Sequence, residues 1–330
     1  MSARFPDRDT IHTVLSLATR APSVHNSQPW RWRVGAQSLD LYADSELHLP
    51  STDPDRRDLM LSCGAALHHC VVALAALGWQ AKVDRFPNPL QPEHLASVEV
   101  YRHPADQLDI KLAAAIPRRR TDRRHYSAWP VPKADITLMG ARAARTGVMV
   151  RQVESLPKLR RIVAQAVRQH ATDQDYLTEL TAWSGRHASV AGVPARSTPE
   201  SDPTALIPGR VFAAPELAQP ADTPSADDNA VVLAIGTTDD DQLARLRAGE
   251  ATSSMLLTAT ALGLSSCPVT EPLEIAETRA AVQEDVFGTS GFPQMLLRVG
   301  WAPVNAEPLP STPRRPLEHV VKWPAGADGN

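Results

Sequence analysis

The sequence has 330 residues with a formal net charge of −3, and 43% of its residues are hydrophobic. This balance predicts a globular protein with a sizeable core and argues against nucleic acid or an anionic membrane as partners. Three cysteines without CxxC spacing, Cys63, Cys70 and Cys267, fit small core residues in a reducing compartment. The charged N-terminal residues and the short apolar runs predict neither a signal peptide nor a membrane span, so we expect a cytoplasmic protein.

A helix predicted at residues 11–20 leads into the loop RAPSVHNSQPWRW, residues 20–32. Between two prolines this loop presents a dense set of hydrogen-bonding side chains, Ser23, His25, Asn26, Ser27 and Gln28. Such a set suits a flat heteroaromatic ligand, because the prolines restrict the conformations of the loop. An ordinary helix end followed by a strand with core-facing tryptophans explains the same residues, and the loop alone leaves both interpretations open.

The segments CGAALHHCVVALAALGW at 63–79 and AGEATSSMLLTATALGL at 248–264 resemble each other. Gly64 and Gly249 occupy the same place in the two segments, and both segments contain Ala-Leu-Gly at the same distance from that glycine. A predicted strand and a helix-capping Thr and Asp cluster precede each segment, and another predicted strand follows. Composition alone explains any single similarity of this kind, but four similarities in the same order indicate a repeated helix, strand, helix, strand unit.

The repeat predicts two halves, residues 1–110 and residues 111–330, related by an internal pseudo-two-fold axis. Their central helices are predicted at 58–78 and 244–263 and are apolar around most of their circumference. Each should therefore run through a core or pack against its counterpart. A cleft along the axis is the expected place for a ligand.

The densest charge is RRRTDRR, residues 118–124, with five arginines in seven residues. Solvated surface charge, a nucleic-acid or localisation patch, and a phosphate clamp are the competing interpretations, and the acidic chain disfavours the second. In an extended segment Arg119, Thr121 and Arg123 lie on one face. Two guanidinium groups and a hydroxyl on one face suit a phosphate monoester.

Residues 185–230 contain seven of the 29 prolines and lack the periodicity of a helix or a strand. A flexible linker is one interpretation, but the interspersed apolar residues favour an ordered extended segment, which we treat as a candidate lid. The tail TPRRPLEHVV, residues 312–321, returns to apolar character after two arginines, so it should dock on the fold.

Several chemistries lack support in the sequence. There is no GxGxxG or GxxxxGK[ST] loop for a dinucleotide or P-loop site, and no nucleophile elbow for a hydrolase. His68 and His69 lie within an apolar helix without partners at metal-ligand spacing, so we expect core histidines and no metal site.

Three motifs together are similar to those of the nitroreductase family of FMN enzymes. RAPSVHNSQPWRW resembles the AP[ST]xxNxQPW signature, RRRTDRR resembles RR[ST]xR, and RRPLEHVV is similar to the phosphate-contacting C-terminus of the family. The motif order, the length and the Pro-rich insert resemble the mycobacterial Acg subfamily, in which one chain supplies both halves of the usual homodimer. The resemblance implies an α+β sandwich of the nitroreductase type, internally duplicated, with a lid.

The resemblance also implies one FMN site per chain, because the loop motif occurs only in the first half and the arginine motif only in the second. From the first half the implied cofactor-binding residues are Pro22, Ser23, Asn26, Gln28, Pro29 and Trp30. From the second half they are Arg119, Arg120, Thr121, Arg123, Arg314 and, in the turn CPVTEP, Pro268, Thr270 and Glu271. Thr270 and Glu271 replace the Glu-Gly pair that is usual in the family, so the implied contact near flavin N5 uses the backbone.

The implied activity is reduction of nitroaromatics or quinones by NAD(P)H through FMN, with no catalytic acid or base supplied by the protein for hydride transfer. The expected partners are FMN, NAD(P)H and a small aromatic electron acceptor, and the expected state is a monomer that acts as an intramolecular pseudo-dimer. The alternative is a catalytically silent protein that binds or sequesters FMN beneath a closed lid. A basic nucleic-acid binder without flavin is the third reading.

Overall fold

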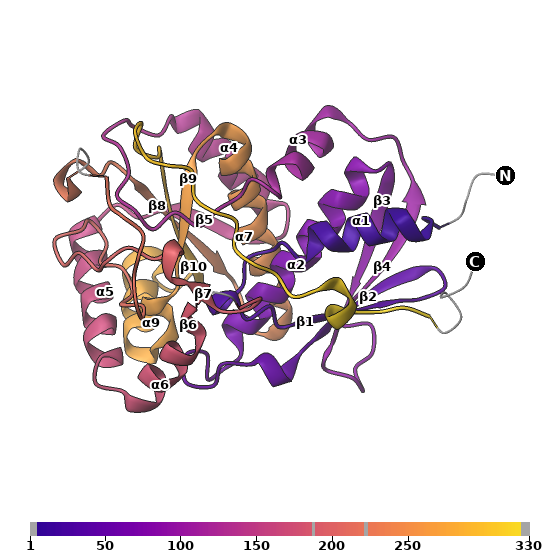
Figure 1. The fold of residues 1–330 in the computed structure, drawn as a ribbon, viewed down its shortest axis with the longest axis horizontal. Coiled ribbons are helices and arrows are strands. Elements are labelled where there is room, and N and C mark those ends of the chain that lie inside the picture. Colours follow the sequence, from indigo (N-terminus) through magenta and orange to yellow (C-terminus); the bar gives the residue numbers. More distant parts are fainter. Residues whose placement is uncertain (1–4, 187–188, 221–223, 325–330) are drawn as a thin grey trace.

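The computed structural model describes residues 5–186, 189–220 and 224–324 as two large, mainly antiparallel sheets and one small two-stranded sheet, with helices between and around the large sheets (Figure 1). The helices are α1 (Arg8–Ala18), α2 (Arg57–Ala76), α3 (Gln107–Ala115), α4 (Lys133–Ala144), α5 (Leu156–His170), α6 (Gln174–Trp183), α7 (Gln242–Leu262), α8 (Glu271–Glu274), α9 (Ala276–Val282) and α10 (Leu317–Val320). The strands are β1 (Trp30–Val34), β2 (Ser38–Ala43), β3 (Trp79–Arg85), β4 (His94–Arg102), β5 (Met149–Gln152), β6 (Ser184–Arg186), β7 (Val193–Pro194), β8 (Val231–Thr237), β9 (Ser265–Val269), β10 (Phe292–Gly300) and β11 (Val321–Lys322). Short helical turns are η1 (Val24–Asn26), η2 (Ser45–Leu47), η3 (Ala195–Ser197), η4 (Ser225–Asp227) and η5 (Gln283–Phe287).

The two large sheets share one topology. The first has the order β11-β1-β2-β4-β3 and the second has the order β5-β8-β10-β9. Without β11, each contains an antiparallel strand pair, then a long helix, and then two further strands arranged in the same neighbour order. This likeness supports the repeated unit, while the limits of the two halves stay a prediction.

The helices α2 and α7 cross at the centre of the molecule, between the two sheets (Figure 1). A Cβ atom on Gly64 would overlap the carbonyl oxygen of Leu246, and one on Gly249 would overlap that of Leu61. The two backbones therefore touch, and the predicted packing of each central helix against its counterpart is confirmed. Among the described residues α2 alone is long and apolar enough to suit a membrane span, and most of it is buried in this core.

The alternation of buried and exposed side chains along β1 explains why the two tryptophans are spaced two residues apart. Trp30 and Trp32 point into the first core and Arg31 points outward, as a half-buried strand requires. The core-facing interpretation of the tryptophans is confirmed. The tail docks beside this strand, because β11 pairs in parallel with β1 through Trp32 and Val321.

The Pro-rich segment is more structured than its sequence suggests. The expectation that it forms no strand is wrong at its start, where β6 and β7 pair in parallel through Ser184 and Val193. The remaining described part has only short 3-10 turns. It is tied to both halves, since Gln28 Nε2 donates to Val190 O at 2.9 Å and Arg123 Nη1 donates to Ser197 O at 3.0 Å.

The helix crossing predicts a sharp intolerance of added volume. We expect Gly64→Ala to lower the free energy of unfolding by about 1–3 kcal/mol or more, because backbone must move to admit the methyl group. Gly140→Ala is the matched control, since its Cβ would lie 3.9 Å from Val150 in ordinary contact and α4 would gain helix propensity. Urea unfolding measures both. Equal stabilities of the two variants would contradict the close crossing.

Candidate functional site

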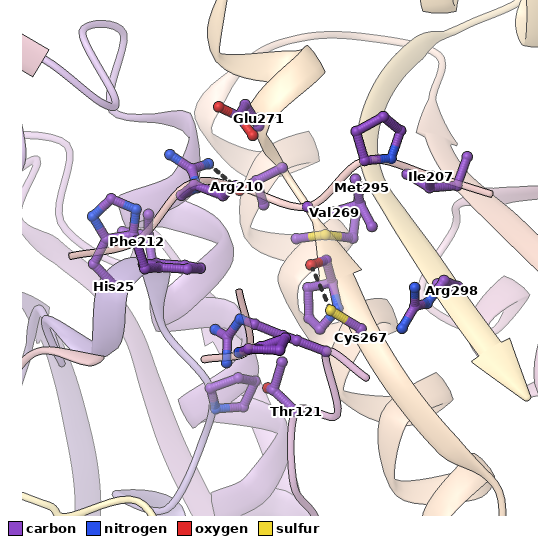
Figure 2. A pocket seen from close by; sticks show the side chains of 18 of the residues that line it. His25, Thr121, Ile207, Arg210, Phe212, Cys267, Val269, Glu271, Met295 and Arg298 are labelled. Carbon is purple, nitrogen blue, oxygen red and sulfur yellow. Dashed lines mark hydrogen bonds between the residues drawn. The ribbon is translucent and has the colours of Figure 1, made fainter. Parts of the chain in front are cut away.

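Two adjoining cavities lie where the two halves meet. The larger has a volume of about 170 Å³ and the smaller about 60 Å³. The two cavities share part of their walls, and five residues line both: Pro22, Ser23, His25, Thr121 and Arg123. The walls come from the loop before β1, from α2, from the arginine motif, from the end of β9 and from the Pro-rich segment. Figure 2 shows side chains from these elements converging on the larger cavity.

The smaller cavity is strongly cationic. Arg119, Arg120, Arg123 and Arg314 line it, and no carboxylate side chain is among the described residues of its wall. Arg119 is only 6% exposed, and its Nε and Nη1 atoms have no hydrogen-bond partner in the described structure. Burial, and then the neighbouring arginines, lower the pKa of Arg119 to about 10. At neutral pH it therefore stays charged, and its free N–H groups suit a phosphate oxygen.

The second half of the arginine motif divides between the cavities and the core. Thr121 and Arg123 face the cavities, whereas Asp122 and Arg124 form a buried ion pair at 2.9 Å. The carboxylate of Asp122 is thereby kept away from the cavity wall. Arg119, Thr121 and Arg123 all line the smaller cavity, but Arg120 lines it too, so its wall does not follow strict alternation.

Arg314 combines a place in the cavity wall with a structural task. Its guanidinium donates to the carbonyl oxygens of Thr19 at 3.1 Å and Arg20 at 3.0 Å, at the end of α1, and to Asn26 Oδ1 at 3.0 Å. Burial, followed by nearby arginines, lowers the pKa of Arg314 to about 9. This residue therefore positions the loop as well as adding positive charge to the cavity.

The predicted loop residues separate into two groups. Pro22 and Ser23 line both cavities and Asn26 lines the smaller one, but Gln28, Pro29 and Trp30 are not among the lining residues. The Gln28 side chain accepts from Arg315 N at 2.8 Å and donates to Val190 O at 2.9 Å, so it joins the loop to the tail and to the Pro-rich segment. The structure thus brings the first three to the cavity and leaves the other three behind it.

The turn after β9 forms another wall of the larger cavity. Pro268, Thr270 and Glu271 all line it. Their side chains are bonded elsewhere, because Thr270 Oγ1 donates to Glu274 at 2.7 Å and Glu271 Oε1 lies 3.2 Å from His170 Nδ1. What this turn offers to a ligand is therefore mainly backbone.

The Pro-rich segment contributes Arg210 to the wall of the larger cavity, a residue that sequence reasoning missed (Figure 2). Its buried guanidinium pairs with Glu274, donates to Thr270 Oγ1 at 3.2 Å and bonds Tyr176. Nearby, Phe212 lies under the guanidinium of Arg123 at 4.9 Å. The only sequence signal for Arg210 is an arginine among apolar residues, because its partners lie far away along the chain.

Comparisons with known proteins show the family of this chain. The Nitroreductase family model matches residues 116–301. The protein named "Putative NAD(P)H nitroreductase Rv3131" of Mycobacterium tuberculosis is 66% identical over 324 residues, covering 98% of this chain and 94% of that protein. The M. tuberculosis protein named "Putative NAD(P)H nitroreductase acg" is 37% identical over 323 residues, covering 94% and 95%. The chain belongs to the nitroreductase family.

Solved structures of the family were compared as well. The FMN-dependent nitroreductase NfnB from Mycobacterium smegmatis, solved with NADPH, is 16% identical, with a TM-score of 0.40 over 66% of this chain and all of that chain. A Bacteroides fragilis nitroreductase solved with bound FMN is 16% identical, with a TM-score of 0.39 over 59% of this chain and 90% of that chain.

The nitroreductase motifs do not reveal the buried acidic pair beside the larger cavity. Asp58 lies in the cavity wall, and burial raises its pKa although Arg57 lies 3.1 Å away. Asp53 accepts from the N–H groups of Asp58 and Leu59 at 2.9 and 2.8 Å, yet burial also raises its pKa. The guanidinium of Arg57 is a single positive charge beside two buried carboxylates. The folded state therefore favours one proton shared by the pair.

The two adjacent histidines of α2 lie at the contact with α7 and in the core. His68 Nδ1 lies 2.8 Å from Ser253 Oγ on α7, and His69 is buried in the core. Within residues 5–186, 189–220 and 224–324, no group of three or more His, Cys, Asp or Glu residues is placed to hold a metal ion.

The acidic pair predicts a pH-dependent stability. An acid whose pKa rises on folding binds more protons in the folded state, so the free energy of unfolding falls as the pH rises from about 4 towards the raised value. We expect the free energy of unfolding of Asp58→Asn to fall less than that of wild type as the pH rises. The difference between the urea midpoints of the variant and of wild type should therefore shift in favour of the variant between about pH 4.5 and pH 8. Asp84→Asn, at an exposed position, is the control. Parallel pH profiles for wild type and Asp58→Asn would refute the assignment.

Proposed function

We propose that this chain is an FMN-binding oxidoreductase that reduces nitroaromatics or quinones with NAD(P)H. The observation that carries the proposal is a cationic cavity, with no carboxylate among the described residues of its wall, that adjoins a larger cavity of mixed polarity. Membership of the nitroreductase family and the names of the M. tuberculosis relatives support it.

The residues of the smaller cavity fit the phosphate of FMN. A phosphate monoester carries roughly −1.5 to −2 charges at neutral pH, and the free N–H groups of Arg119 can donate to it. Arg123 and the hydroxyl of Thr121 lie in the wall that the two cavities share. The larger cavity would hold the flavin ring between the Pro22–Ser23 loop and the turn at Pro268.

Bound FMN supplies hydride transfer, first from NAD(P)H and then to the second substrate. The task of the protein is to hold the phosphate, orient the ring and keep water from it, which requires no acid or base for the hydride step. Pro22, Ser23, Thr270 and the Pro-rich segment carry out this orientation in the proposal.

The two repeated units differ at the residues of the larger cavity, and this difference favours a single flavin site per chain. At the spacing that pairs Gly64 with Gly249, Ala65 and Thr270 of the larger cavity correspond to Glu250 and Arg85. These counterparts form a bidentate ion pair, with both contacts at 2.7 Å and Glu250 buried. The ion pair occupies the sequence positions that correspond to this part of the cavity wall, which argues for one site per chain and supports a monomer that acts as an intramolecular pseudo-dimer.

The phosphate assignment is tested by a charge-removing substitution. We expect Arg119→Gln to weaken FMN binding at least about tenfold, because hydrogen bonds to charged groups contribute about 1.5–3 kcal/mol. Riboflavin, which has no phosphate, should bind wild type and variant alike. Flavin fluorescence quenching on the ligand-free chain measures both ligands, with exposed Arg118→Gln as the matched control. Unchanged FMN affinity in Arg119→Gln would exclude this cavity as the phosphate site.

A second candidate function is FMN binding without turnover, and the closed Pro-rich segment favours it. The cavities of about 170 and 60 Å³ are smaller than the range of about 300–1,000 Å³ common for ligand pockets. Arg210 anchors the Pro-rich segment to α8 through an ion pair with the buried carboxylate of Glu274. With FMN in place, the second substrate would need the segment to open.

Stopped-flow reduction by NADPH separates the two candidates. We expect wild-type chain loaded with FMN to be reduced slowly, and Arg210→Met to be reduced at least about tenfold faster because the segment loses its anchor. Arg196→Met, at an exposed position of the same segment, should behave as wild type. Fast reduction of wild type, unchanged in Arg210→Met, would support the enzyme and contradict the closed segment. No reduction of either protein at millimolar NADPH would contradict the enzyme.

A further inference from the structure

The loop before β1 holds His25 in an unusual backbone conformation. Its φ is +45°, and Asn26 and Gln28 each have φ of +55°. Left-handed backbone is uncommon for residues other than glycine and persists where surrounding contacts enforce it. Here two residues of the docked tail hold the loop just after His25. The guanidinium of Arg314 donates to Asn26 Oδ1, and the backbone N–H of Arg315 donates to Gln28 Oε1.

The side chain of His25 lies at the junction of the two cavities and lines both. It is 7% exposed, and neither ring nitrogen has a hydrogen-bond partner within the described part of the chain. The nearest ring is that of Phe212, edge-on with 6.1 Å between centroids (Figure 2). Because buried polar atoms are nearly always bonded in folded proteins, two unpartnered nitrogens on a cavity wall indicate that a ligand is meant to bond them.

The surroundings of His25 determine which ligand atoms suit it. Burial, and then the charges of Arg210, Arg123 and His170, lower the pKa of His25 well below its usual value. The ring is therefore neutral at physiological pH, with one N–H donor and one lone pair. It can donate to a carbonyl oxygen or accept from an amide N–H, so a planar amide matches it.

We propose that His25 is a ligand-contacting residue that hydrogen-bonds the amide group of a planar heteroaromatic ligand in the larger cavity. This inference rests on the proposed function and deepens it by naming the contact. Two ligands of the proposed reaction share that chemistry, since the flavin ring carries an imide and the nicotinamide carries a carboxamide.

The experiment combines affinity with stability. His25→Leu removes both nitrogens at similar volume, and we expect it to weaken binding of one ligand at least about tenfold. We also expect its ligand-free urea midpoint to equal or exceed that of wild type, because two unsatisfied buried polar atoms are removed. His25→Asn keeps an N–H and a carbonyl and tolerates left-handed backbone, so it should recover part of the affinity. His12→Leu, at an exposed position of α1, is the control.

Two binding arms identify the ligand. Titration calorimetry with FMN on the ligand-free chain tests a contact between His25 and the flavin imide. Titration with NADPH on the FMN-loaded chain tests a contact between His25 and the nicotinamide carboxamide. Weakening in either arm, with stability kept, supports the inference. His25→Leu that binds both ligands like wild type, or that is less stable with unchanged affinities, overturns it. Failure of wild type to bind FMN would instead overturn the proposed function, and NADPH binding to the ligand-free wild type and His25→Leu would then test His25.

Discussion

The close crossing of α2 and α7 is the constraint on which the rest of the structure depends. Gly64 and Gly249 let the two backbones touch, so each sheet packs on its own side of one shared helix pair. The loop from the first half and the arginine motif from the second are thereby brought to one junction. A side chain at either glycine would separate the two walls of the cavities, and the functional site would lose its shape along with part of the core.

Charge at the junction is arranged for a ligand at a cost to the protein. Arg119 is buried beside other arginines without a carboxylate in the described wall of the smaller cavity, and within the described residues neither nitrogen of His25 has a partner. Such groups destabilise a folded chain unless an anion and a hydrogen-bonding ligand compensate them. Of the acidic pair, Asp58 lines only the larger cavity and Asp53 lines neither, so the pair does not neutralise Arg119 in the smaller cavity.

Local sequence rules predicted some features of the site and could not predict others. Alternation along an extended segment grouped Arg119, Thr121 and Arg123, which all line the smaller cavity, and helix apolarity predicted the central packing. The loop composition could not tell that Gln28 turns toward Val190 and the tail, because that direction depends on contacts distant in sequence. Arg210 was missed for the same reason, since its partner Glu274 lies in another element.

The central claim is one flavin site per chain, with its phosphate in the arginine cavity at the junction of the halves. A crystal structure of the full chain with FMN tests it most directly. The account predicts one FMN, with the phosphate against Arg119, Thr121 and Arg123, the ring beside His25, and the Arg85–Glu250 pair intact. A phosphate bound away from these arginines, or a second FMN displacing the Arg85–Glu250 pair, would contradict it.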